Sequence, residues 1–379
     1  MPTISIVTVD GGGNIPPTLR IAGELARRGH RIEVLGHRRM ADAVARAGHA
    51  FRTLDSLDFW NPGVRRSVPT AIGQTTRLAS DREIEREVRD AVSAAGSDAA
   101  LVDSLMASSI RGAQAAGAPA AVHFHTFLEF WEHSYRRGPV GLAARLRGAD
   151  PLTEWARAAA QLVVSDAALD PASARRTPLE RSAEWVGALE SGVPATPDDS
   201  APPLVVASLS TTWFPGQTEV YQHIATALGA LPVRGLITLG GLEPDRELRL
   251  PPNVEVRERA DHSEVFPQAS LVIGHGGHST TFRALAHGLP VIVVPMHPLL
   301  DQPMIGRSVE RAGAGRTLSR TAPAERIAAA VTELLADDRA RDAATALGAR
   351  LRATDAAGAA ADAVERLAGD RSTRRAPAA

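Results

Sequence analysis

A histidine–glycine turn in the second half of the chain is the strongest candidate for a chemical site. It reads Ile273-Gly-His-Gly-Gly-His-Ser-Thr280, and helical spacing of apolar residues begins directly after it. Glycines at 276 and 277 let a ligand approach the backbone closely, and a helix start offers free N–H groups and a positive dipole end. Such a turn can bind an anion in a chain that contains no lysine. The alternative is a tight strand-to-helix turn that carries an incidental histidine.

A second glycine turn, Asp10-Gly-Gly-Gly-Asn14, follows the first apolar run of the chain. Dinucleotide-binding domains also carry a glycine turn after a strand, with a third glycine in register and an acidic residue at the end of the next strand. Here the third glycine position is Pro16, and the next strand ends in Gly36-His-Arg-Arg39. The sequence therefore disfavours a nicotinamide-dependent oxidoreductase.

Titratable side chains beside predicted strand ends are candidates for a general base. Asp10 lies in the first turn, and Asp103 follows a second apolar run. His123 and His125 lie at the end of a third run. Carboxylates and imidazoles are the usual general bases of enzymes, and histidine titrates near neutrality. For each residue the alternative is structural, namely a helix cap or a hydrogen bond within the core.

Aromatic residues are scarce, and five of the fifteen in the chain lie between His123 and Tyr135. This segment follows a predicted strand, so its rings are candidates for the wall of a pocket that binds a flat or apolar ligand. Trp60, next to Phe59 in a predicted loop, is a further candidate. The alternative is that these rings form the buried stripe of an amphipathic helix. The candidate wall residues are Trp60, Phe124, Phe127, Phe130 and Trp131.

All these candidates lie at the ends of strands in a regular alternation of strands and helices. Pro16 and Pro17, with the apolar spacing after them, predict a helix directly after the first glycine turn. A strand, a helix and a strand in succession form a βαβ unit, and such units build parallel sheets. Strands are expected at 4–9, 31–35, 51–54, 99–102, 120–124, 204–209, 235–239, 254–256, 270–274 and 290–295, and further helices at 39–47, 82–95, 105–116, 217–230, 278–287, 301–312, 323–336 and 339–368.

The length of the chain and a proline-rich segment predict two domains. A chain of 379 residues exceeds what one hydrophobic core usually serves. Residues 190–203 contain four prolines and no apolar periodicity, so we expect a linker there. The expected parts are an N-terminal domain (1–189), a C-terminal domain (204–350) and a terminal helix (351–379). This helix is expected to pack back toward the N-terminal domain and to be frayed from Arg371 onward.

Composition excludes several kinds of chemistry. The formal net charge is −1, which removes the basic excess expected of a general nucleic-acid-binding protein. Cysteine is absent, which excludes disulfides, thiolate metal sites and a cysteine nucleophile, and no metal-ligand spacing is evident. No stretch approaches about 18 apolar residues, and the start of the chain lacks the pattern of a signal peptide. These features predict a cytoplasmic protein.

The turn and the segments after it resemble the donor-binding signature of glycosyltransferases with the GT-B fold. The matching segments are His275-Gly-Gly-His-Ser-Thr280, Ala284-Leu-Ala-His-Gly-Leu-Pro290, Pro295-Met296 and Asp301-Gln-Pro303. The resemblance extends to actinobacterial natural-product glycosyltransferases, which are allied to the UDP-glycosyltransferases. It implies an α/β fold in which two Rossmann-like domains face each other across a cleft. It also implies that the N-terminal domain binds an acceptor and the C-terminal domain a nucleotide-sugar donor.

The resemblance further implies which residues bind the donor. The turn would hold the pyrophosphate together with the loop at Ser210, the segment 253–262 would lie against the nucleobase, and Asp301 and Gln302 would bind sugar hydroxyls. Ile305 stands where the family usually has asparagine, which leaves sugar selectivity open. The implied donor-binding residues are Ser210, Thr211, Arg259, Ala260, His275, Gly276, Gly277, Ser279, Thr280, Asp301 and Gln302.

The base that is usual in this family is missing. Many relatives carry histidine in the first glycine turn, whereas alignment through Pro17 puts Asn14 at that position. Asparagine cannot accept a proton at neutral pH. Asp103 matches the aspartate that normally orients that histidine, so it is the first candidate for a substitute base, and His125 is the second. Asp10 is a further candidate, and Asn14 could aim the acceptor oxygen.

The resemblance therefore implies an inverting glycosyltransferase that uses a dTDP- or UDP-linked sugar as co-substrate. Neither a cofactor nor a metal ion is expected. The expected acceptor is a hydrophobic small molecule such as a natural-product aglycone; nucleic acid and stable membrane insertion are not expected, and a homodimer stays open. The alternatives are a lipid or cell-wall glycosyltransferase, a sugar-nucleotide epimerase and a sugar-nucleotide-binding auxiliary protein without catalytic activity.

Overall fold

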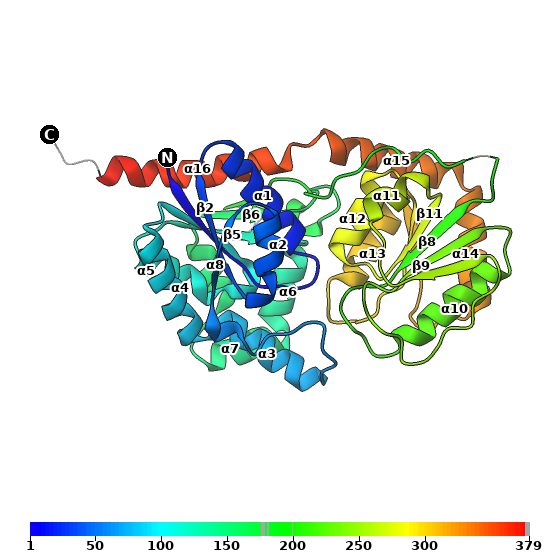
Figure 1. Cartoon of the computed structure of the whole chain (residues 1–379), viewed down its shortest axis with the longest axis horizontal. Coiled ribbons are helices and arrows are strands. Elements are labelled where there is room, and N and C mark those ends of the chain that lie inside the picture. Colours follow the sequence, from blue (N-terminus) through cyan, green and yellow to red (C-terminus); the bar gives the residue numbers. More distant parts are fainter. Residues whose placement is uncertain (176–178, 180–181, 199, 376–379) are drawn as a thin grey trace. The chain divides into compact units, whose positions relative to one another are not determined.

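The computed structural model describes residues 1–175, 179, 182–198 and 200–375 (Figure 1). The chain forms two compact units. The first contains Met1–Pro62, Arg66–Leu189 and the segment from Asp355 onward, and the second contains Gly63–Arg65 and Glu190–Thr354. The chain therefore leaves the first unit after Leu189 and returns to it at Asp355.

The first unit is built around a parallel sheet with the strand order β3-β2-β1-β4-β5-β6-β7. The order reverses at β1, which pairs with β2 on one side and with β4 on the other. In open α/β sheets, ligands bind beyond the carboxyl ends of the strands at such a reversal. The strands are β1 (Thr3–Val7), β2 (Arg31–Gly36), β3 (Ala50–Thr53), β4 (Ala99–Asp103), β5 (Ala120–Phe124), β6 (Ala160–Val163) and β7 (Ala183–Trp185).

The second unit repeats this plan with a parallel sheet in the order β10-β9-β8-β11-β12-β13. Its reversal lies at β8, between β9 and β11. The strands are β8 (Leu204–Ser208), β9 (Arg234–Thr238), β10 (Val254–Arg257), β11 (Leu271–Gly274), β12 (Val291–Val293) and β13 (Gly315–Thr317). Two parallel Rossmann-like sheets confirm the predicted α/β class.

Helices pack on the sheets of both units (Figure 1). In β1, Ile6 and Val7 belong to different hydrophobic clusters, because successive side chains of a strand point to opposite faces. The helices of the first unit are α1 (Ile15–Arg27), α2 (Ala41–Arg46), α3 (Val68–Ser80), α4 (Arg82–Ala95), α5 (Ser108–Ala115), α6 (Leu128–Arg137), α7 (Pro139–Leu146), α8 (Pro151–Arg157) and α16 (Ala356–Arg375). Those of the second are α10 (Gln217–Gly229), α11 (His262–Val265), α12 (His278–Ala286), α13 (Gln302–Arg311), α14 (Ala324–Ala336) and α15 (Asp338–Ala353).

The C-terminal segment is not the single helix that the sequence predicts over 339–368. α15 ends at Ala353, and α16 begins at Ala356. Asp355 lies directly before α16, and its carboxylate accepts a hydrogen bond from the Gly358 N–H (2.9 Å), as the N-cap residue that starts a new helix does. α16 continues to Arg375, and the fraying expected from Arg371 onward stays a prediction. Residues 376–379 lie outside the described part.

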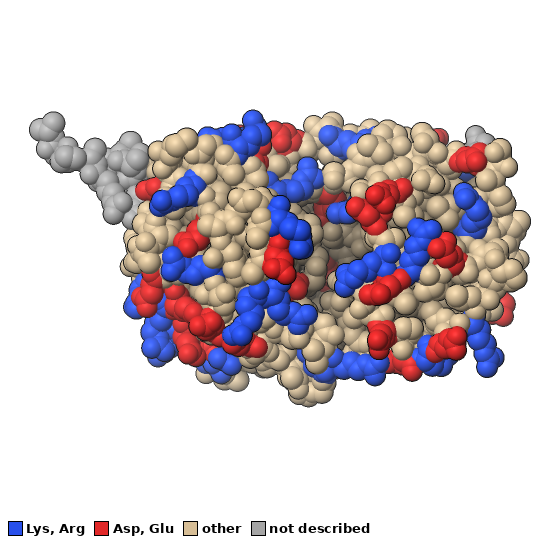
Figure 2. Space-filling model, in the orientation of Figure 1, with Lys and Arg blue, Asp and Glu red and all other residues tan. Residues whose placement is uncertain are grey.

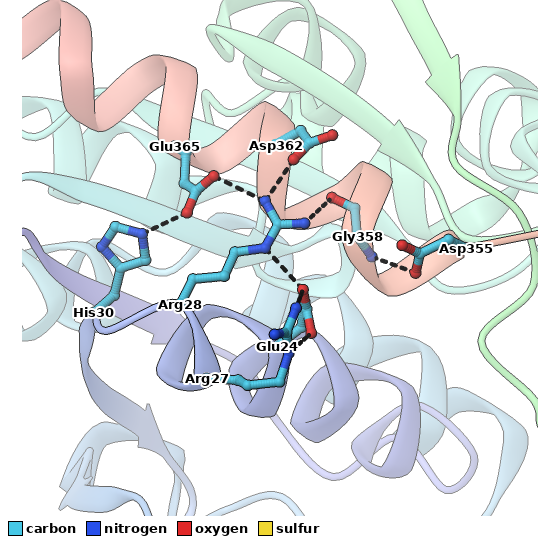
Figure 3. A network of polar contacts seen from close by, with 8 residues as sticks. All are labelled: Glu24, Arg27, Arg28, His30, Asp355, Gly358, Asp362 and Glu365. Carbon is cyan, nitrogen blue, oxygen red and sulfur yellow. Dashed lines mark hydrogen bonds and ion pairs between the residues drawn. The ribbon is translucent and has the colours of Figure 1, made fainter.

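A polar network joins α16 to α1 within the first unit (Figure 3). The Arg28 guanidinium, directly after α1, binds Glu24 (2.7 Å) and, on α16, Glu365 (2.8 Å). His30 Nε2 lies 2.7 Å from the other oxygen of Glu365. Hydrogen bonds from Arg27 and Arg28 lower the pKa of Glu24 to about 2. α16 is therefore fastened to the first unit through charge as well as through its buried alanines.

Charges of both signs are mixed on one face of the molecule. On the face drawn in Figure 2, arginine side chains and carboxylates alternate, and neither sign forms a continuous stripe. Of the helices in the described ranges, none has the length and apolar content that crossing a bilayer requires.

Candidate functional site

The histidine–glycine turn lies at the strand-order reversal of the second sheet. β11 ends at Gly274, and α12 begins at His278 after Gly277, which provides no side-chain cap. The first N–H groups of α12 therefore have no capping side chain, and the helix dipole adds a partial positive charge there. Ser279 and Thr280 are half-buried in this first turn of the helix.

At Gly276 the turn packs closely against the loop that follows β12. Its φ is +84°, and a Cβ at this position would lie 2.7 Å from the backbone oxygen of Gln302 and 2.7 Å from a methyl group of Val293. The Gln302 side-chain oxygen in turn accepts hydrogen bonds from Met296 N (2.7 Å) and His297 N (3.0 Å). The turn, the 296–301 loop and the start of α13 therefore pack against one another.

This packing changes the role expected for Gln302. The side chain is 2% exposed, and its oxygen already accepts two backbone hydrogen bonds. The geometry therefore does not support the prediction that this oxygen binds a sugar, whereas it does show how Gln302 shapes the loop. Asp301, at the N-cap of α13, is half-buried, and its role in sugar binding stays a prediction.

His275 is a buried, neutral imidazole in the turn. Burial lowers its pKa to about 4, although a hydrogen bond with the Ser208 backbone opposes that shift. The ring covers Gly277, where a Cβ would lie 2.4 Å from Nε2. The Nδ1 atom is buried without a hydrogen-bond partner. His275 can therefore offer a hydrogen bond to a ligand, but it carries no positive charge near neutral pH.

The Ser210–Thr211 loop follows β8, the strand next to β11. Ser210 has a φ of +142°, and among the described residues no other non-glycine residue has a positive φ. Its hydroxyl accepts a hydrogen bond from Thr212 N (2.9 Å), which holds this unfavourable conformation in place. Backbone strain of this kind is stored mainly at functional sites. Thr211 is exposed at the carboxyl edge of the sheet.

The loops after β9 and β10 complete this edge of the second unit. The exposed guanidinium of Arg259 lies over Gly241, where a Cβ would be 2.0 Å from Nη2. A Cβ on Gly240 would lie 2.6 Å from the Ser210 oxygen. Ala260 follows and is half-buried before α11. The predicted donor residues thus follow four strands of one sheet, β10, β8, β11 and β12, and the glycine loop after β9 lies between them.

A buried polar cluster lies at the reversal of the first sheet. Asp103, at the end of β4, is 0% exposed. One carboxylate oxygen accepts hydrogen bonds from Asn14 Nδ2 (2.7 Å) and the Thr8 hydroxyl (3.1 Å), and the other accepts one from Leu105 N (2.9 Å). The Asn14 side-chain oxygen accepts a hydrogen bond from Gly11 N (2.8 Å). Asn14 therefore links the first glycine turn to Asp103.

Two histidines from the end of β5 flank the same carboxylate. His123 is 0% exposed and lies 3.7 Å from one oxygen of Asp103 and 3.1 Å from the Thr18 hydroxyl. Burial lowers its pKa to about 4. The His125 Nδ1 lies 3.5 Å from the other oxygen, and its side chain is 16% exposed. Burial would raise the pKa of Asp103, but the two histidines and its hydrogen bonds hold it well below its usual value.

Two of the candidate bases are held by hydrogen bonds within the protein. Asp103 is 0% exposed, which does not favour the prediction that it is itself the base. Asp10 is half-buried, and one of its oxygens accepts a hydrogen bond from Gly12 N (3.0 Å) within the turn. Its backbone oxygen accepts one from the Trp60 indole. Asp10 therefore stabilises the first glycine turn.

The aromatic segment is largely buried. Phe124 (0% exposed) and Trp131 (2% exposed) belong to the main hydrophobic cluster of the first unit, and Phe127 is also 0% exposed. Phe124 and Trp131 both pack edge-on or tilted against Trp155. Trp60 is also buried, at 5%. The burial of these four rings favours the alternative of a buried stripe, since burying large aromatic surface stabilises the fold, and their role in acceptor binding stays a prediction. Phe130 alone of the five is half-buried.

Sequence reasoning missed one buried pair beside the turn. Glu190 lies 3.4 Å from His278 Nδ1 at the start of α12, and both side chains are buried. Glu190 belongs to the segment that the sequence marks as a linker, and no local pattern links it to a residue 88 positions away. Sequence reasoning also missed Thr8, which donates a hydrogen bond to Asp103. Its position directly after β1 could have marked it as a residue at the edge of the sheet.

The described residues contain no group of three or more histidine, aspartate or glutamate side chains arranged to hold a metal ion.

The chain is similar in sequence to part of several named glycosyltransferases. Residues 227–370 match the family described as erythromycin biosynthesis protein CIII-like, C-terminal domain. Demethyllactenocin mycarosyltransferase from Streptomyces fradiae is 31% identical over 173 residues, which are 45% of this chain and 37% of that protein. Zeaxanthin glucosyltransferase from Pseudescherichia vulneris is 32% identical over 168 residues, 43% of this chain and 40% of that protein. These matches span well under half of the relatives' own length.

Solved structures match over nearly the whole chain. The glycosyltransferase of kitacinnamycin has a TM-score of 0.80 at 23% identity and covers 97% of this chain and 99% of its own. The calicheamicin glycosyltransferase CalG4 has a TM-score of 0.75 at 23% identity, with full coverage of both chains. Identities this low establish the fold alone. The chain therefore has the fold of GT-B glycosyltransferases, and its residues 227–370 match the family of the erythromycin biosynthesis protein CIII-like C-terminal domain.

Proposed function

We propose that this protein transfers a sugar from a dTDP- or UDP-linked donor to a hydrophobic small molecule, with inversion at the anomeric carbon. The observation that carries the proposal is the turn at 275–280. It lies within the family match, has uncapped helix N–H groups and contains a buried histidine nitrogen without a partner. The diphosphate of a nucleotide sugar would accept hydrogen bonds from the helix N–H groups and from the histidine together.

The same turn would stabilise the leaving group. As the bond between the anomeric carbon and the phosphate oxygen breaks, negative charge develops on the nucleoside diphosphate. The N–H groups of Ser279 and Thr280 and the His275 ring would bind that charge, with Ser210 and Thr211 approaching from the neighbouring loop. The segment around Arg259 and Ala260 would lie against the nucleobase of the sugar donor.

The acceptor class is supported by the relatives. Their names refer to demethyllactenocin and zeaxanthin, and the similar structures are named for kitacinnamycin and calicheamicin. One of the solved structures, the glycosyltransferase VinC at a TM-score of 0.67 and 15% identity, is a complex with dTDP. A direct test measures consumption of dTDP-glucose and UDP-glucose with and without a panel of polycyclic phenols and alcohols. Donor binding without consumption under all conditions would favour a non-catalytic binding protein.

Replacing His275 by alanine is expected to weaken dTDP or UDP binding at least tenfold. A hydrogen bond to a charged group is worth about 1.5–3 kcal/mol, and about 1.4 kcal/mol corresponds to a factor of ten. Isothermal titration calorimetry measures the affinity, and a thermal melt checks that the second unit remains folded. His49→Ala in the first unit is the matched control. Unchanged affinity in His275→Ala would remove the turn as the phosphate site.

Turnover is expected to need no divalent metal ion. The N-terminus of α12 carries the positive charge that Mg²⁺ would otherwise supply to the leaving diphosphate. We expect the same rate in EDTA and in MgCl₂. Activity that is lost in EDTA and returns with added Mg²⁺ would contradict this prediction.

A further inference from the structure

We propose that His125, oriented by Asp103, is the general base that takes the proton from the acceptor. This inference rests on the proposed function, because it assigns the proton transfer of that reaction. It differs from the simple expectation in which Asp103 itself takes the proton. It assigns separate tasks to three residues of the buried cluster: Asn14 fixes the carboxylate, Asp103 orients the imidazole and His125 reacts.

The carboxylate is held in one orientation before any ligand binds. Asn14 and Thr8 donate to one oxygen of Asp103, which leaves the other oxygen facing Leu105 N and His125. Asp103 therefore stays ionised and cannot rotate without breaking these hydrogen bonds. An amide is suited to this task, because its NH₂ group donates to Asp103 while its oxygen accepts from Gly11 N.

Of the two histidines beside Asp103, only His125 has an exposed face. His123 is 0% exposed and His125 is 16% exposed. With the Nδ1 proton directed at the carboxylate, the lone pair of His125 lies on Nε2, the atom on the opposite side of the ring. The 3.5 Å separation is at the outer limit of a hydrogen bond, and such contacts shorten when a substrate is bound.

The aromatic cluster supports the imidazole from behind. Trp131 contacts His125 edge-on, with ring centroids 5.2 Å apart and an angle of 78° between the rings. Trp131 is in turn packed against Phe124, Phe130 and Trp155. The rings that the sequence suggested as a pocket wall therefore limit the rotation of the base.

The resulting step balances without a further reactant. The acceptor oxygen forms a bond to the anomeric carbon while the bond from that carbon to the diphosphate breaks. The acceptor proton moves to His125 Nε2, and the imidazolium formed is stabilised by the ionised Asp103. The proton then leaves to solvent through the exposed face of the ring.

The pH dependence of this step depends on the groups around the imidazole. Titratable groups on the adjoining elements are Asp10, Asp103, His123, Glu132 and Tyr135. Burial and the nearby Asp103 raise the pKa of the Tyr135 hydroxyl, so it stays protonated. Glu132 is paired with Arg175 at 3.2 Å. Asp103 lies 3.5 Å from His125 Nδ1, and the neighbouring His123 also interacts with His125 electrostatically.

Kinetics on two kinds of acceptor test the assignment. His125→Ala is expected to lower kcat at least 100-fold for an aliphatic alcohol, but less than tenfold for an acidic phenol that ionises by itself. The acidic limb of the pH–rate profile for the alcohol should disappear in this variant. His133→Ala, an exposed histidine on α6, is the control and should leave both rates unchanged. A merely structural role of His125 would lower both rates equally, which would overturn the proposal.

The tautomer of His125 can be measured in the protein without an acceptor. In ¹⁵N-histidine NMR spectra, assigned by loss of signal in His125→Ala, neutral His125 should carry its proton on Nδ1. A proton on Nε2 would overturn the proposal. Calorimetry with dTDP and UDP separates this outcome from failure of the proposed function, since a wrong base leaves nucleotide binding intact. Binding without turnover of any acceptor would also refute the base while keeping the donor site.

Discussion

Asp103→Ala is expected to lower the free energy of unfolding of the first unit by about 3–5 kcal/mol, which is the usual cost of removing one member of a buried, hydrogen-bonded charged cluster. The substitution leaves the Thr8 hydroxyl, the Asn14 amide and the Leu105 N–H without their acceptor. Each buried polar group without a partner costs about 1–3 kcal/mol. Asp103→Asn, which keeps an acceptor oxygen, should cost less.

Tryptophan fluorescence during urea unfolding measures this effect in the right unit. Trp60, Trp131, Trp155 and Trp185 belong to the first unit, and Trp213 belongs to the second, so the signal reports mainly on the first. Asp42→Ala, on an exposed position of α2, is the control and should change stability by less than about 0.5 kcal/mol. A loss in Asp103→Ala no larger than that of the control would show that the cluster contributes little to folding.

The stabilising effect of Asp103 should also depend on pH in one direction. Its pKa is lower in the folded protein than the unfolded value of about 3.9. The contribution is therefore complete above that value and is lost progressively as the pH falls toward the folded pKa. The difference in stability between wild type and Asp103→Ala should be constant from pH 7 to 5 and smaller at pH 3.5. A difference that grew at acid pH would contradict the ionised state.

The repeated strand–helix plan could be predicted from the sequence because its signals are local. Glycine after an apolar run, proline at a helix start and apolar spacing identified β1, α1 and the β11–α12 turn within a few residues. α3 was missed, since Thr, Gly and Val are weak helix formers, and the helix depends on its Ser67 cap and its buried Leu78. The break before α16 was missed because one capping aspartate decides it.

The residues of the candidate sites also divide into those that local sequence identifies and those that only the fold identifies. Gly276 and Gly277 could be identified because glycine reports directly on backbone geometry. The direction of a side chain depends on contacts between distant segments, so the sequence could not show that Asp103 is enclosed or that Trp131 faces the core. The pairing of Asn14 with Asp103 spans 89 positions, and only the fold brings the two together.

Gly276→Ala is expected to weaken binding of dTDP and UDP at least 100-fold and to destabilise the second unit. The residue has a φ of +84°, where an L-residue costs about 1–2 kcal/mol. A new methyl group would also lie 2.7 Å from the Gln302 backbone oxygen, too close for any real contact. The start of α13 would have to move, and the hydrogen bonds from Met296 N and His297 N to Gln302 would move with it. A 100-fold loss corresponds to about 2.7 kcal/mol.

Gly148→Ala separates the effect of the steric overlap from that of the backbone conformation. Gly148 has nearly the same φ, +80°, and a Cβ there meets nothing within 4 Å. This control, in the first unit, should therefore lose only the conformational cost of about 1–2 kcal/mol and should bind nucleotide as wild type does. Calorimetry gives the affinities, and thermal unfolding gives the stabilities. If Gly276→Ala also bound nucleotide normally, the close contact between the turn and α13 would be irrelevant to the ligand, and the diphosphate would have to bind elsewhere on the second unit.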